Sequence, residues 1–179
     1  AALMDAETGR VLWERNMDAP MSVASTTKIM TAIIALESGK LDETAIVSKK
    51  AAVTPKVRLG LSSGEEYILG GLLYPLMLQS CNDSAVVIAE HIGGSVEGFA
   101  ELMNEKAREI GAKNTKFVTP NGLDKDDNHS TAYDMALITR YALENEDFCR
   151  LISTPSYSFS SCNGKRSFTV SNKNRLLNE

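Results

Sequence analysis

Two stretches of the chain are apolar on nearly every face and are predicted to be buried helices. The first begins near Ser25 and ends before Gly39, and the second runs from Ser84 to His91. A helix that is hydrophobic all round lies in the interior of a protein, so we expect these two at the centre of the fold. Between them, residues 72–78 repeat apolar side chains at helical spacing and predict a third helix.

Two further helices are indicated by their capping residues. Ser95 is placed to cap an amphipathic helix, and Gly111 ends it. Thr131 and Asp134 have the spacing of a capping box, which predicts a helix that continues through Leu143. The caps therefore predict where both helices begin.

Short apolar or alternating runs on either side of glycine turns predict two β-hairpins. One joins residues 1–5 to residues 11–15, and the other joins residues 156–160 to residues 166–171 around Asn163-Gly164. Because two strands alone are marginally stable in water, the first hairpin needs further partners.

Two segments have no clear periodicity. Residues 41–64 are expected to form a connecting loop with little chemistry, and residues 115–128 are rich in loop-forming side chains. The acidic run at residues 124–128 suggests a calcium loop, but His129 stands where such a loop needs glycine and Met135 where it needs a bidentate glutamate. We therefore reject a calcium site and expect no metal.

Length and composition are those of one globular domain. The chain has 179 residues, of which 43% are hydrophobic and 23% charged, and these values exclude disordered, collagen-like and coiled-coil proteins. The net charge of −4 and the pI of about 5.3, without a basic stripe, argue against a nucleic-acid partner. The longest apolar runs are near ten residues, too short to span a bilayer, and the chain starts without a signal-like segment.

The cysteines and histidines give little support to metal or redox chemistry. The three cysteines have no Cys-x-x-Cys spacing, and their odd number leaves at least one unpaired. Cys149 and Cys162 could pair if the chain between them folds back, whereas Cys81 is expected to be a small buried filler. We interpret His91 and His129 as structural and expect no cofactor.

Ser25 and Lys28 are the first candidate catalytic pair. Three residues are just under one helical turn, so both side chains lie on one face of a helix that starts near Ser25. A serine needs a base to act as a nucleophile, and a lysine serves only if its pKa falls from about 10.4 to roughly 7 or 8. The apolar run after Lys28 and the positive end of the helix dipole both favour the neutral amine. The same spacing also occurs by chance on solvated helix faces.

Ser80 and Asn82 are the second candidate pair and lie between two apolar helical stretches. Alternate positions of a tight turn point the hydroxyl and the carboxamide to one side, where they can relay a proton and hold an amide. An ordinary helix-to-helix turn also favours Ser and Asn, because both bond the local backbone. The pair is therefore informative only together with Ser25 and Lys28.

The combination of the two pairs resembles a known family. A Ser-x-x-Lys on a buried helix, followed 55 positions later by Ser-x-Asn, is similar to the first two active-site motifs of penicillin-recognising serine enzymes. Longer segments resemble the low-molecular-mass penicillin-binding D-alanyl-D-alanine carboxypeptidases of bacterial cell-wall maturation. These segments are residues 1–11, 90–99, 103–107, 114–124 and 130–136. The resemblance covers essentially the whole chain.

The resemblance implies an α+β fold, the sandwich of the β-lactamase and D,D-peptidase type, in which an antiparallel sheet accompanies a largely helical subdomain. It implies one domain over residues 1–179. Residues 1–40 would form the hairpin and the nucleophile helix, residues 41–150 the helical subdomain, and residues 151–179 a hairpin leading to C-terminal sheet strands that lie outside this chain.

The family's catalytic roles carry over to the four candidate residues. Ser25 would be the nucleophile, acylated by the carbonyl of the penultimate D-Ala, and Lys28 would be its general base. Ser80 would pass a proton to the departing D-Ala amine. Asn82 would hold a backbone carbonyl of the substrate and help to orient Lys28. The Ser25 backbone N–H would supply half of the oxyanion hole, and water would release the acyl-enzyme.

The implied function is that of a serine D,D-carboxypeptidase that removes the terminal D-Ala from peptidoglycan stem pentapeptides. Its partners would be stem peptides ending in D-Ala-D-Ala and β-lactam antibiotics, which inhibit it, and it would need no cofactor. It would be a secreted protein acting on the extracytoplasmic side of the bacterial membrane, with a role in cell shape. Peripheral membrane association would require a segment outside these residues.

The chain departs from the family pattern at its third motif. A Lys-Thr-Gly should follow the run at residues 171–178, but the 179 residues contain none. This motif would provide the group that binds the terminal carboxylate of the substrate and lie beside the second oxyanion donor. We expect truncation rather than natural loss, which puts turnover by these residues alone in doubt. Cys81 also departs from the small or acidic residue expected between Ser80 and Asn82.

Two alternatives stay open. A β-lactamase of the nearest type needs a Glu-x-x-x-Asn before its last helices, and residues 115–130 contain none. A non-catalytic peptidoglycan-binding or scaffold protein on the same fold is compatible with the missing third motif. Within the enzyme interpretation, carboxypeptidase and endopeptidase are not separated, because both cut the same kind of D,D bond.

Overall fold

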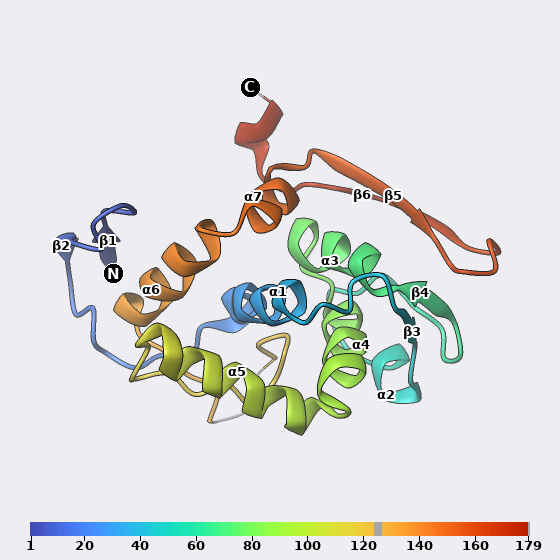
Figure 1. Ribbon diagram of the computed structural model, residues 1–179, viewed down its shortest axis with the longest axis horizontal. Coiled ribbons are helices and arrows are strands. Elements are labelled where there is room, and N and C mark those ends of the chain that lie inside the picture. Colours follow the sequence, from blue (N-terminus) through green and yellow to red (C-terminus); the bar gives the residue numbers. More distant parts are fainter. Residues whose placement is uncertain (124–126, 179) are drawn as a thin grey trace.

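The computed structural model describes residues 1–123 and 127–178 and consists of a helical body with three two-stranded sheets in the described part (Figure 1). The α-helices are α1 Lys28–Glu37, α2 Lys49–Ala52, α3 Leu69–Leu78, α4 Asn82–Gly93, α5 Val96–Ile110, α6 Ala132–Leu143 and α7 Glu146–Ser153. The strands are β1 Ala2–Met4, β2 Val11–Glu14, β3 Thr44–Ile46, β4 Glu66–Ile68, β5 Ser156–Ser160 and β6 Ser167–Ser171. Short 3-10 helices cover Ala24–Thr27 and Arg175–Asn178.

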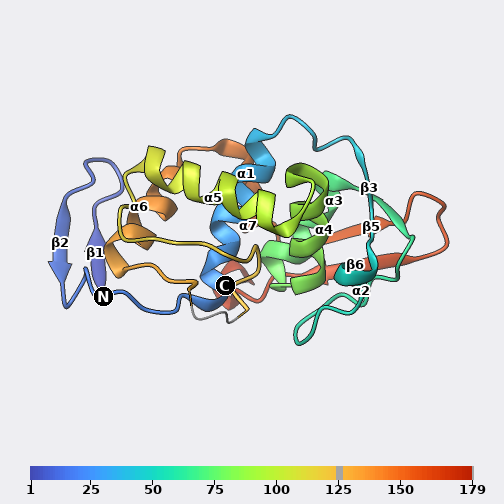
Figure 2. The same cartoon turned by 90° about the horizontal axis from the view of Figure 1, so that it is seen from below.

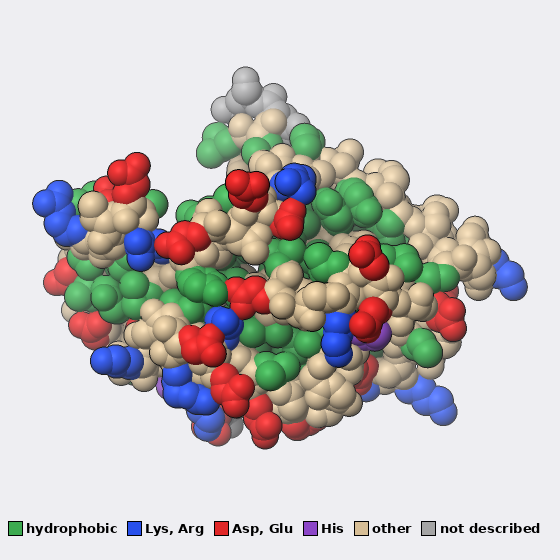
Figure 3. All heavy atoms as spheres, viewed as in Figure 1, with side chains coloured by type: hydrophobic (Ala, Val, Ile, Leu, Met, Phe, Trp, Pro, Cys, Tyr) green, Lys and Arg blue, Asp and Glu red, His purple; other side chains and the backbone are tan. Residues whose placement is uncertain are grey.

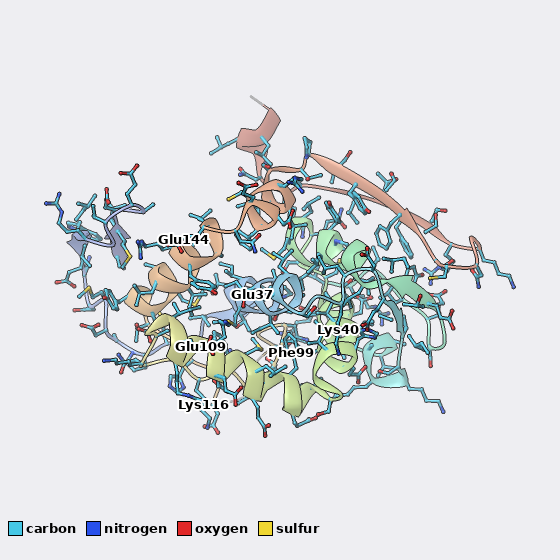
Figure 4. All side chains as sticks on the ribbon, viewed as in Figure 1. Glu37, Lys40, Phe99, Glu109, Lys116 and Glu144 are labelled. Carbon is cyan, nitrogen blue, oxygen red and sulfur yellow. The ribbon has the colours of Figure 1, made fainter. Side chains whose placement is uncertain are left out.

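Helix α1 lies at the centre of the molecule, as its apolar sequence predicts. It contacts α3, α4, α5, α6 and α7, which surround it (Figure 1). Met30, Ala32 and Ala35 are completely buried within it. Glu37, labelled on α1 in Figure 4, lies at the far end of this helix. It accepts a hydrogen bond from Tyr141 Oη (2.7 Å) on α6 and pairs with Lys106 (2.9 Å) on α5. Helix α1 is therefore held at both its apolar middle and its polar end.

The entry into α1 differs from the prediction by one turn. The helix predicted to begin near Ser25 opens with a 3-10 turn, Ala24–Thr27, and α1 itself starts at Lys28. The chain enters this turn through Ala24 in a left-handed conformation (φ 44°). Thr26 then donates to the Val23 carbonyl through both its backbone N–H (3.1 Å) and its Oγ1 (2.6 Å). A hydrogen bond across three residues winds the chain more tightly than the four-residue spacing of an α-helix.

The two other apolar helices are confirmed and pack against α1. Helix α4 includes the predicted residues 84–91, which are almost entirely buried up to Ala89. Helix α3 starts three residues before the predicted residues 72–78 and includes Gly70 and Gly71. A side chain at Gly70 would come within 3.2 Å of the Leu41 carbonyl oxygen, so the glycine permits this close approach.

The expectation of a featureless loop at residues 41–64 is wrong. This region contains β3, which pairs antiparallel with β4, and the short helix α2. The Ser48 side chain caps α2 by accepting a hydrogen bond from Ala51 N (3.0 Å). A three-residue strand and a four-residue helix are too short to show the periodicity on which the prediction rests.

The capped helices are confirmed, and one helix was not predicted. Ser95 Oγ accepts from Gly98 N (2.9 Å) at the start of α5, which ends at Gly111 in a left-handed conformation (φ 92°). Thr131 Oγ1 accepts from Asp134 N (3.0 Å) at the start of α6. Helix α7 follows directly on α6 and has no counterpart in the sequence-based prediction, although Asn145 caps it clearly.

Both predicted hairpins are present, at opposite ends of the molecule (Figure 2). The β1–β2 hairpin contacts α6, and the β5–β6 hairpin contacts α3. The second contact is aromatic: Tyr157 stacks on Tyr74 with ring centroids 3.5 Å apart. The described strands thus form separate pairs around the helical body rather than one sheet.

The visible surface carries charges of both signs, and the three cysteines are unpaired. Acidic and basic side chains are interspersed on the face shown in Figure 3. No helix in the described ranges is long and apolar enough to cross a membrane. Cys81, Cys149 and Cys162 are all free thiols, so the pairing of the last two that the sequence leaves open is not formed.

Candidate active site

Ser25 and Lys28 are joined as the sequence predicts. Lys28 Nζ donates a hydrogen bond to Ser25 Oγ at 3.0 Å. Ser25 is exposed on the 3-10 turn, whereas Lys28, the first residue of α1, is only 2% exposed. The hydroxyl is therefore open to a substrate while the amine beside it is shielded from water. When the amine is neutral, the same distance lets it accept the hydroxyl proton.

The environment of Lys28 favours its neutral form. Burial lowers the pKa of Lys28 to about 8, a shift that the Cys81 thiol opposes and the nearby Lys173 ammonium increases. No carboxylate is among the groups that shift this pKa. A lysine with a pKa near 8 has an appreciable neutral fraction at neutral pH and can act as a general base.

A second hydrogen bond fixes Lys28 from a segment that the sequence-based analysis treated only as a loop. The Asn121 carbonyl oxygen accepts from Lys28 Nζ at 2.8 Å, across 93 positions of sequence. Thr31 Oγ1, one turn further along α1, donates to the neighbouring Pro120 carbonyl at 2.6 Å. The only sequence signal for this contact was the Asn121-Gly122 turn dipeptide.

Gly122 lets the Asn121 segment approach the 3-10 turn that carries Ser25. Its φ is +73°, and a Cβ atom placed on it would overlap the carbonyl group of Ala24, the residue before Ser25. Only glycine combines this backbone conformation with this contact. Asn128 Nδ2 adds a hydrogen bond to Thr27 Oγ1 (3.3 Å) from the same side.

Asn82 lies at the first turn of α4 and is held by the segment after α2. Its backbone N–H donates to the Val57 carbonyl (2.9 Å), and its Nδ2 donates to the Pro55 carbonyl (3.3 Å). The side chain is buried, at 4% exposure, and its Oδ1 has no hydrogen-bond partner among the described residues. A buried unpaired oxygen is costly, so this atom is a candidate contact for a bound peptide.

Ser80 and Cys81 complete the turn before α4. Ser80 is half-buried with a left-handed backbone (φ 64°), and its Oγ makes no hydrogen bond to the described residues. Cys81 is buried, and burial raises the pKa of its thiol to about 11, which agrees with the filler role. Because the charges of Cys81 and Lys28 influence each other, this turn lies beside the base. The predicted roles of Ser80 and Asn82, including the orienting of Lys28 by Asn82, stay predictions.

Asp83 is a buried carboxylate that the sequence-based analysis missed. It is 0% exposed, and its Oδ1 accepts from Leu59 N (3.0 Å) and from Ser84 N (3.0 Å). Its Oδ2 accepts from Gly60 N (2.8 Å) and Leu61 N (3.2 Å). Asp83 thus fixes the segment that holds Asn82, which makes this supposed loop a wall of the site.

Lys173 approaches the same turn from the segment after β6. Its Nζ donates to the Gln79 carbonyl (2.9 Å), and its backbone N–H donates to the Leu78 carbonyl (3.2 Å).

The two histidines make their contacts elsewhere: His91 contacts Glu43 (2.8 Å) and His129 contacts the Asp127 carbonyl (3.0 Å). Neither contact supports a cysteine–histidine catalytic pair.

No site for a metal is visible in the described ranges, where no three or more His, Cys, Asp or Glu side chains converge. Of the acidic run considered as a calcium loop, residues 124–126 lie outside the described part. The exposed Ser25 hydroxyl, the shielded Lys28 amine of lowered pKa and the unpaired Asn82 carboxamide oxygen are groups that can carry out acyl transfer.

Comparison with known sequences points to one family. The profile of the peptidase S11 family, described as D-alanyl-D-alanine carboxypeptidase, matches residues 1–179. The chain is 36% identical over 182 residues to the D-alanyl-D-alanine carboxypeptidase DacF of Bacillus subtilis, covering 99% of the chain and 46% of that protein. It is 34% identical over 175 residues to DacB2 of Mycobacterium tuberculosis, covering 97% of the chain and 59% of the relative. The chain thus spans about half the length of these relatives.

Solved structures agree with the sequence matches. A D-alanyl-D-alanine carboxypeptidase from Mycobacterium tuberculosis superposes with a TM-score of 0.90 at 32% identity, over 98% of this chain and 66% of that one. Penicillin binding protein 6B from Escherichia coli superposes with a TM-score of 0.87 at 30% identity, over 99% of this chain and 58% of that one. These matches confirm the predicted α+β fold class.

Proposed function

Because the chain belongs to the D-alanyl-D-alanine carboxypeptidase family, we propose that it carries the nucleophile and the base of a serine D,D-carboxypeptidase. The proposed substrate is a peptidoglycan stem pentapeptide that ends in D-Ala-D-Ala, and the proposed inhibitors are β-lactams. The observation that carries the proposal is the 3.0 Å hydrogen bond between Ser25 Oγ and Lys28 Nζ, an amine whose pKa is lowered to about 8.

Acylation would proceed by attack of Ser25 Oγ on the carbonyl carbon of the penultimate D-Ala. Neutral Lys28 takes the hydroxyl proton, and the Ser25 backbone N–H stabilises the oxyanion that forms. The C–N bond then breaks, and the departing D-Ala amine receives a proton through Ser80. The acyl-enzyme is an ester of Ser25, which water hydrolyses with Lys28 again as the base.

Asn82 would hold the backbone of the acyl donor. With Nδ2 on the Pro55 carbonyl, the atom left for the substrate is Oδ1, which accepts from a peptide N–H. Nδ2 carries two hydrogens, so it can also donate the one not directed at Pro55 to a peptide carbonyl, which is the role that the family resemblance implies. The carboxamide can therefore pair with the peptide through Oδ1, through Nδ2, or through both.

Several features of the whole protein follow from this proposal. Its substrate is an extracytoplasmic polymer, so we place its action on the outer side of the bacterial membrane. Export, a role in cell shape and peripheral membrane association belong to the same proposal. We also keep residues 1–179 as one domain with the division at residues 1–40, 41–150 and 151–179.

The test uses the full-length protein, including the family's third motif. Incubation with benzylpenicillin is expected to add the mass of one opened β-lactam to the peptide that contains Ser25, and a pentapeptide is expected to release D-alanine. Ser25→Ala abolishes both, whereas Ser38→Ala, at the other end of α1, leaves both intact. An adduct that survives Ser25→Ala, or peptide binding without any release of D-alanine, would contradict the proposal and favour a non-catalytic scaffold.

The lifetime of the adduct separates the carboxypeptidase from a β-lactamase. A β-lactamase hydrolyses its acyl-enzyme rapidly, whereas a penicillin-inhibited peptidase keeps it. We expect the intact mass to retain the adduct for minutes or longer after excess benzylpenicillin is removed. Loss of the adduct within seconds would favour the β-lactamase.

A further inference from the structure

Arg166 joins the β5–β6 hairpin to the segment after α2, which holds Asn82. It lies directly before β6, and its Nη1 donates to the Gly60 carbonyl (3.0 Å) and to Ser62 Oγ (3.1 Å), more than a hundred positions away in sequence. The same nitrogen lies 3.0 Å from Glu65 Oε1. One guanidinium group therefore binds this segment at three places.

The backbone of Gly60 is held at both of its polar groups. Its N–H donates to Asp83 Oδ2 at 2.8 Å, while its carbonyl accepts from Arg166. Asp83 follows Asn82 in α4, and Asn82 donates to two carbonyls of the same segment. The backbone that receives Asn82 is therefore fixed at Gly60 both from the helix and from the hairpin.

The ion pair of Arg166 and Glu65 is partly buried, with side chains 35% and 18% exposed. Glu65 Oε2 also accepts from Ser62 N (2.8 Å) and Tyr67 Oη (2.9 Å). Burial alone would raise the pKa of Glu65, but its hydrogen bonds lower this pKa below the ordinary value. The guanidinium group lies 4.8 Å from the centre of the Phe168 ring. These contacts fix the pair in one place, unlike an isolated ion pair on the surface.

The same hairpin reaches the turn before α4. Lys173, two residues after β6, donates to the Leu78 and Gln79 carbonyls. The hairpin thus contacts the two stretches of chain that border the start of α4, one through Arg166 and the other through Lys173.

Resting on the proposed function, we propose that Arg166 is a positioning residue of the active site. It fixes Gly60 and, through the segment after α2, the Asn82 carboxamide that holds the acyl donor. Ser25 and Lys28 lie on the 3-10 turn and the first turn of α1, bonded to each other and apart from these contacts. Arg166 therefore sets how tightly the acyl donor binds rather than how fast it reacts once bound.

The test is Arg166→Met in the full-length protein. Methionine keeps an apolar side chain beside Phe168 but cannot donate to the Gly60 carbonyl. We expect KM for D-alanine release from a pentapeptide to rise about fivefold or more, with kcat and the pH midpoint of acylation unchanged, because the loss falls on binding. Active sites are counted by titration with labelled benzylpenicillin, so a smaller folded fraction lowers their number but not KM. An unchanged KM, or a fall in kcat alone, overturns the inference.

A double variant, Arg166→Met with Glu65→Gln, separates the Gly60 contact from the ion pair. Arg166→Met alone leaves a partly buried carboxylate without its cation, which is itself destabilising. The double variant removes that charge, so we expect it to regain stability while KM stays high, and it carries the measurement if Arg166→Met does not fold. Arg166→Lys keeps a cation that can donate to one of the acceptors and is expected to raise KM by less. Recovery of KM in the double variant would assign the effect to the unpaired carboxylate and overturn the inference.

Arg150→Met is the matched control. Arg150 also donates to a carboxylate, that of Asp147 (2.7 Å), but both side chains are exposed on α7. We expect this variant to leave KM unchanged, and an equal rise in Arg150→Met and Arg166→Met would mean that only the net charge matters, which overturns the inference. If the unaltered protein releases no D-alanine and forms no penicillin adduct, the proposed function itself fails, a result distinct from retained release with an unchanged KM.

Discussion

Gly122 packs against the carbonyl group of Ala24 so closely that no side chain fits between them. The two residues come from segments almost a hundred positions apart: Gly122 follows Asn121, whose carbonyl accepts from Lys28, and Ala24 precedes Ser25, the proposed nucleophile. Their contact sets how closely the Asn121 segment approaches the turn that carries Ser25. A change at this contact therefore acts on the geometry of catalysis as well as on stability.

Gly122→Ala is expected to lower the rate of acylation by benzylpenicillin by about a hundredfold, because it displaces the turn that carries Ser25. It should also reduce the free energy of unfolding by more than about 2 kcal/mol, since the new Cβ meets backbone atoms. Stopped-flow acylation and urea unfolding measure the two effects.

Gly39→Ala is the control for Gly122→Ala. Gly39 follows the end of α1 and has φ +69°, but nothing lies within 4 Å of a Cβ placed there. The Gly39→Ala variant therefore measures the strain of a left-handed backbone alone, about 1 kcal/mol, and should leave the rate of acylation unchanged. If both variants acylate equally fast, the contact with Ala24 does not position the nucleophile.

Asp83→Asn is expected to slow acylation about tenfold or more, because an amide placed against backbone N–H donors releases the segment that holds Asn82. The variant should also lose about 2–4 kcal/mol of stability. Acylation is measured at a temperature where circular dichroism shows the variant to be fully folded.

Asp134→Asn is the control that separates the effect of Asp83 on the position of Asn82 from its effect on the stability of the protein. Asp134 is also buried, and its Oδ2 accepts from Asn114 N (2.7 Å) and Thr115 Oγ1 (2.8 Å), away from Asn82. We expect a comparable loss of stability with normal acylation. Equal slowing in both variants would show that Asp83 acts through stability alone.

The features predicted from sequence are those that local geometry determines. The Ser25–Lys28 contact follows from helical spacing, and the caps Ser95 and Thr131 follow from one side chain reaching a nearby N–H. The four site residues themselves became identifiable through the family motifs rather than through their spacing alone.

The features that were missed depend on contacts between distant segments. The Asn121 carbonyl is an acceptor that every residue type possesses, so the sequence does not mark it as a partner of Lys28. The sequence likewise does not mark the backbone N–H groups of residues 59–61 as the donors that bind Asp83. Strands as short as β3 and β4 become stable only when they pair, and no window of sequence shows this.

Cys81 is expected to resist alkylation by iodoacetamide at pH 8, because burial raises its thiol pKa to about 11 and leaves almost no thiolate. Cys162 is exposed and should react within the same time. Mass spectrometry of peptides measures both, and the same reaction in denaturant should label all three cysteines. Labelling of Cys81 at the rate of Cys162 in the folded protein would show that the turn between Ser80 and Asn82 opens.

The rate of acylation is expected to rise with pH through a midpoint of about 8, because only neutral Lys28 accepts the Ser25 proton. The Lys173 ammonium helps to lower the pKa of Lys28, so Lys173→Met should move the midpoint to higher pH. Acylation by benzylpenicillin, followed between pH 6 and pH 10, measures both midpoints. A midpoint that stays in place or moves to lower pH in Lys173→Met would exclude this electrostatic coupling.

Lys28→Met is expected to be inactive yet more stable than the unaltered protein at pH 7, by about 1–3 kcal/mol. The pKa of Lys28 falls from 10.5 in the unfolded chain to about 8 on folding, so below pH 8 the folded state holds a buried charge that the unfolded state hydrates. Between these two values the unfolded chain binds the additional proton, and the stability of the unaltered protein rises with pH. The advantage of Lys28→Met should therefore shrink as the pH rises from 8 towards 10.5, which urea unfolding at a series of pH values measures. An advantage that is constant over this range would come from the packing of methionine, and it would mean that Lys28 is not held neutral by burial.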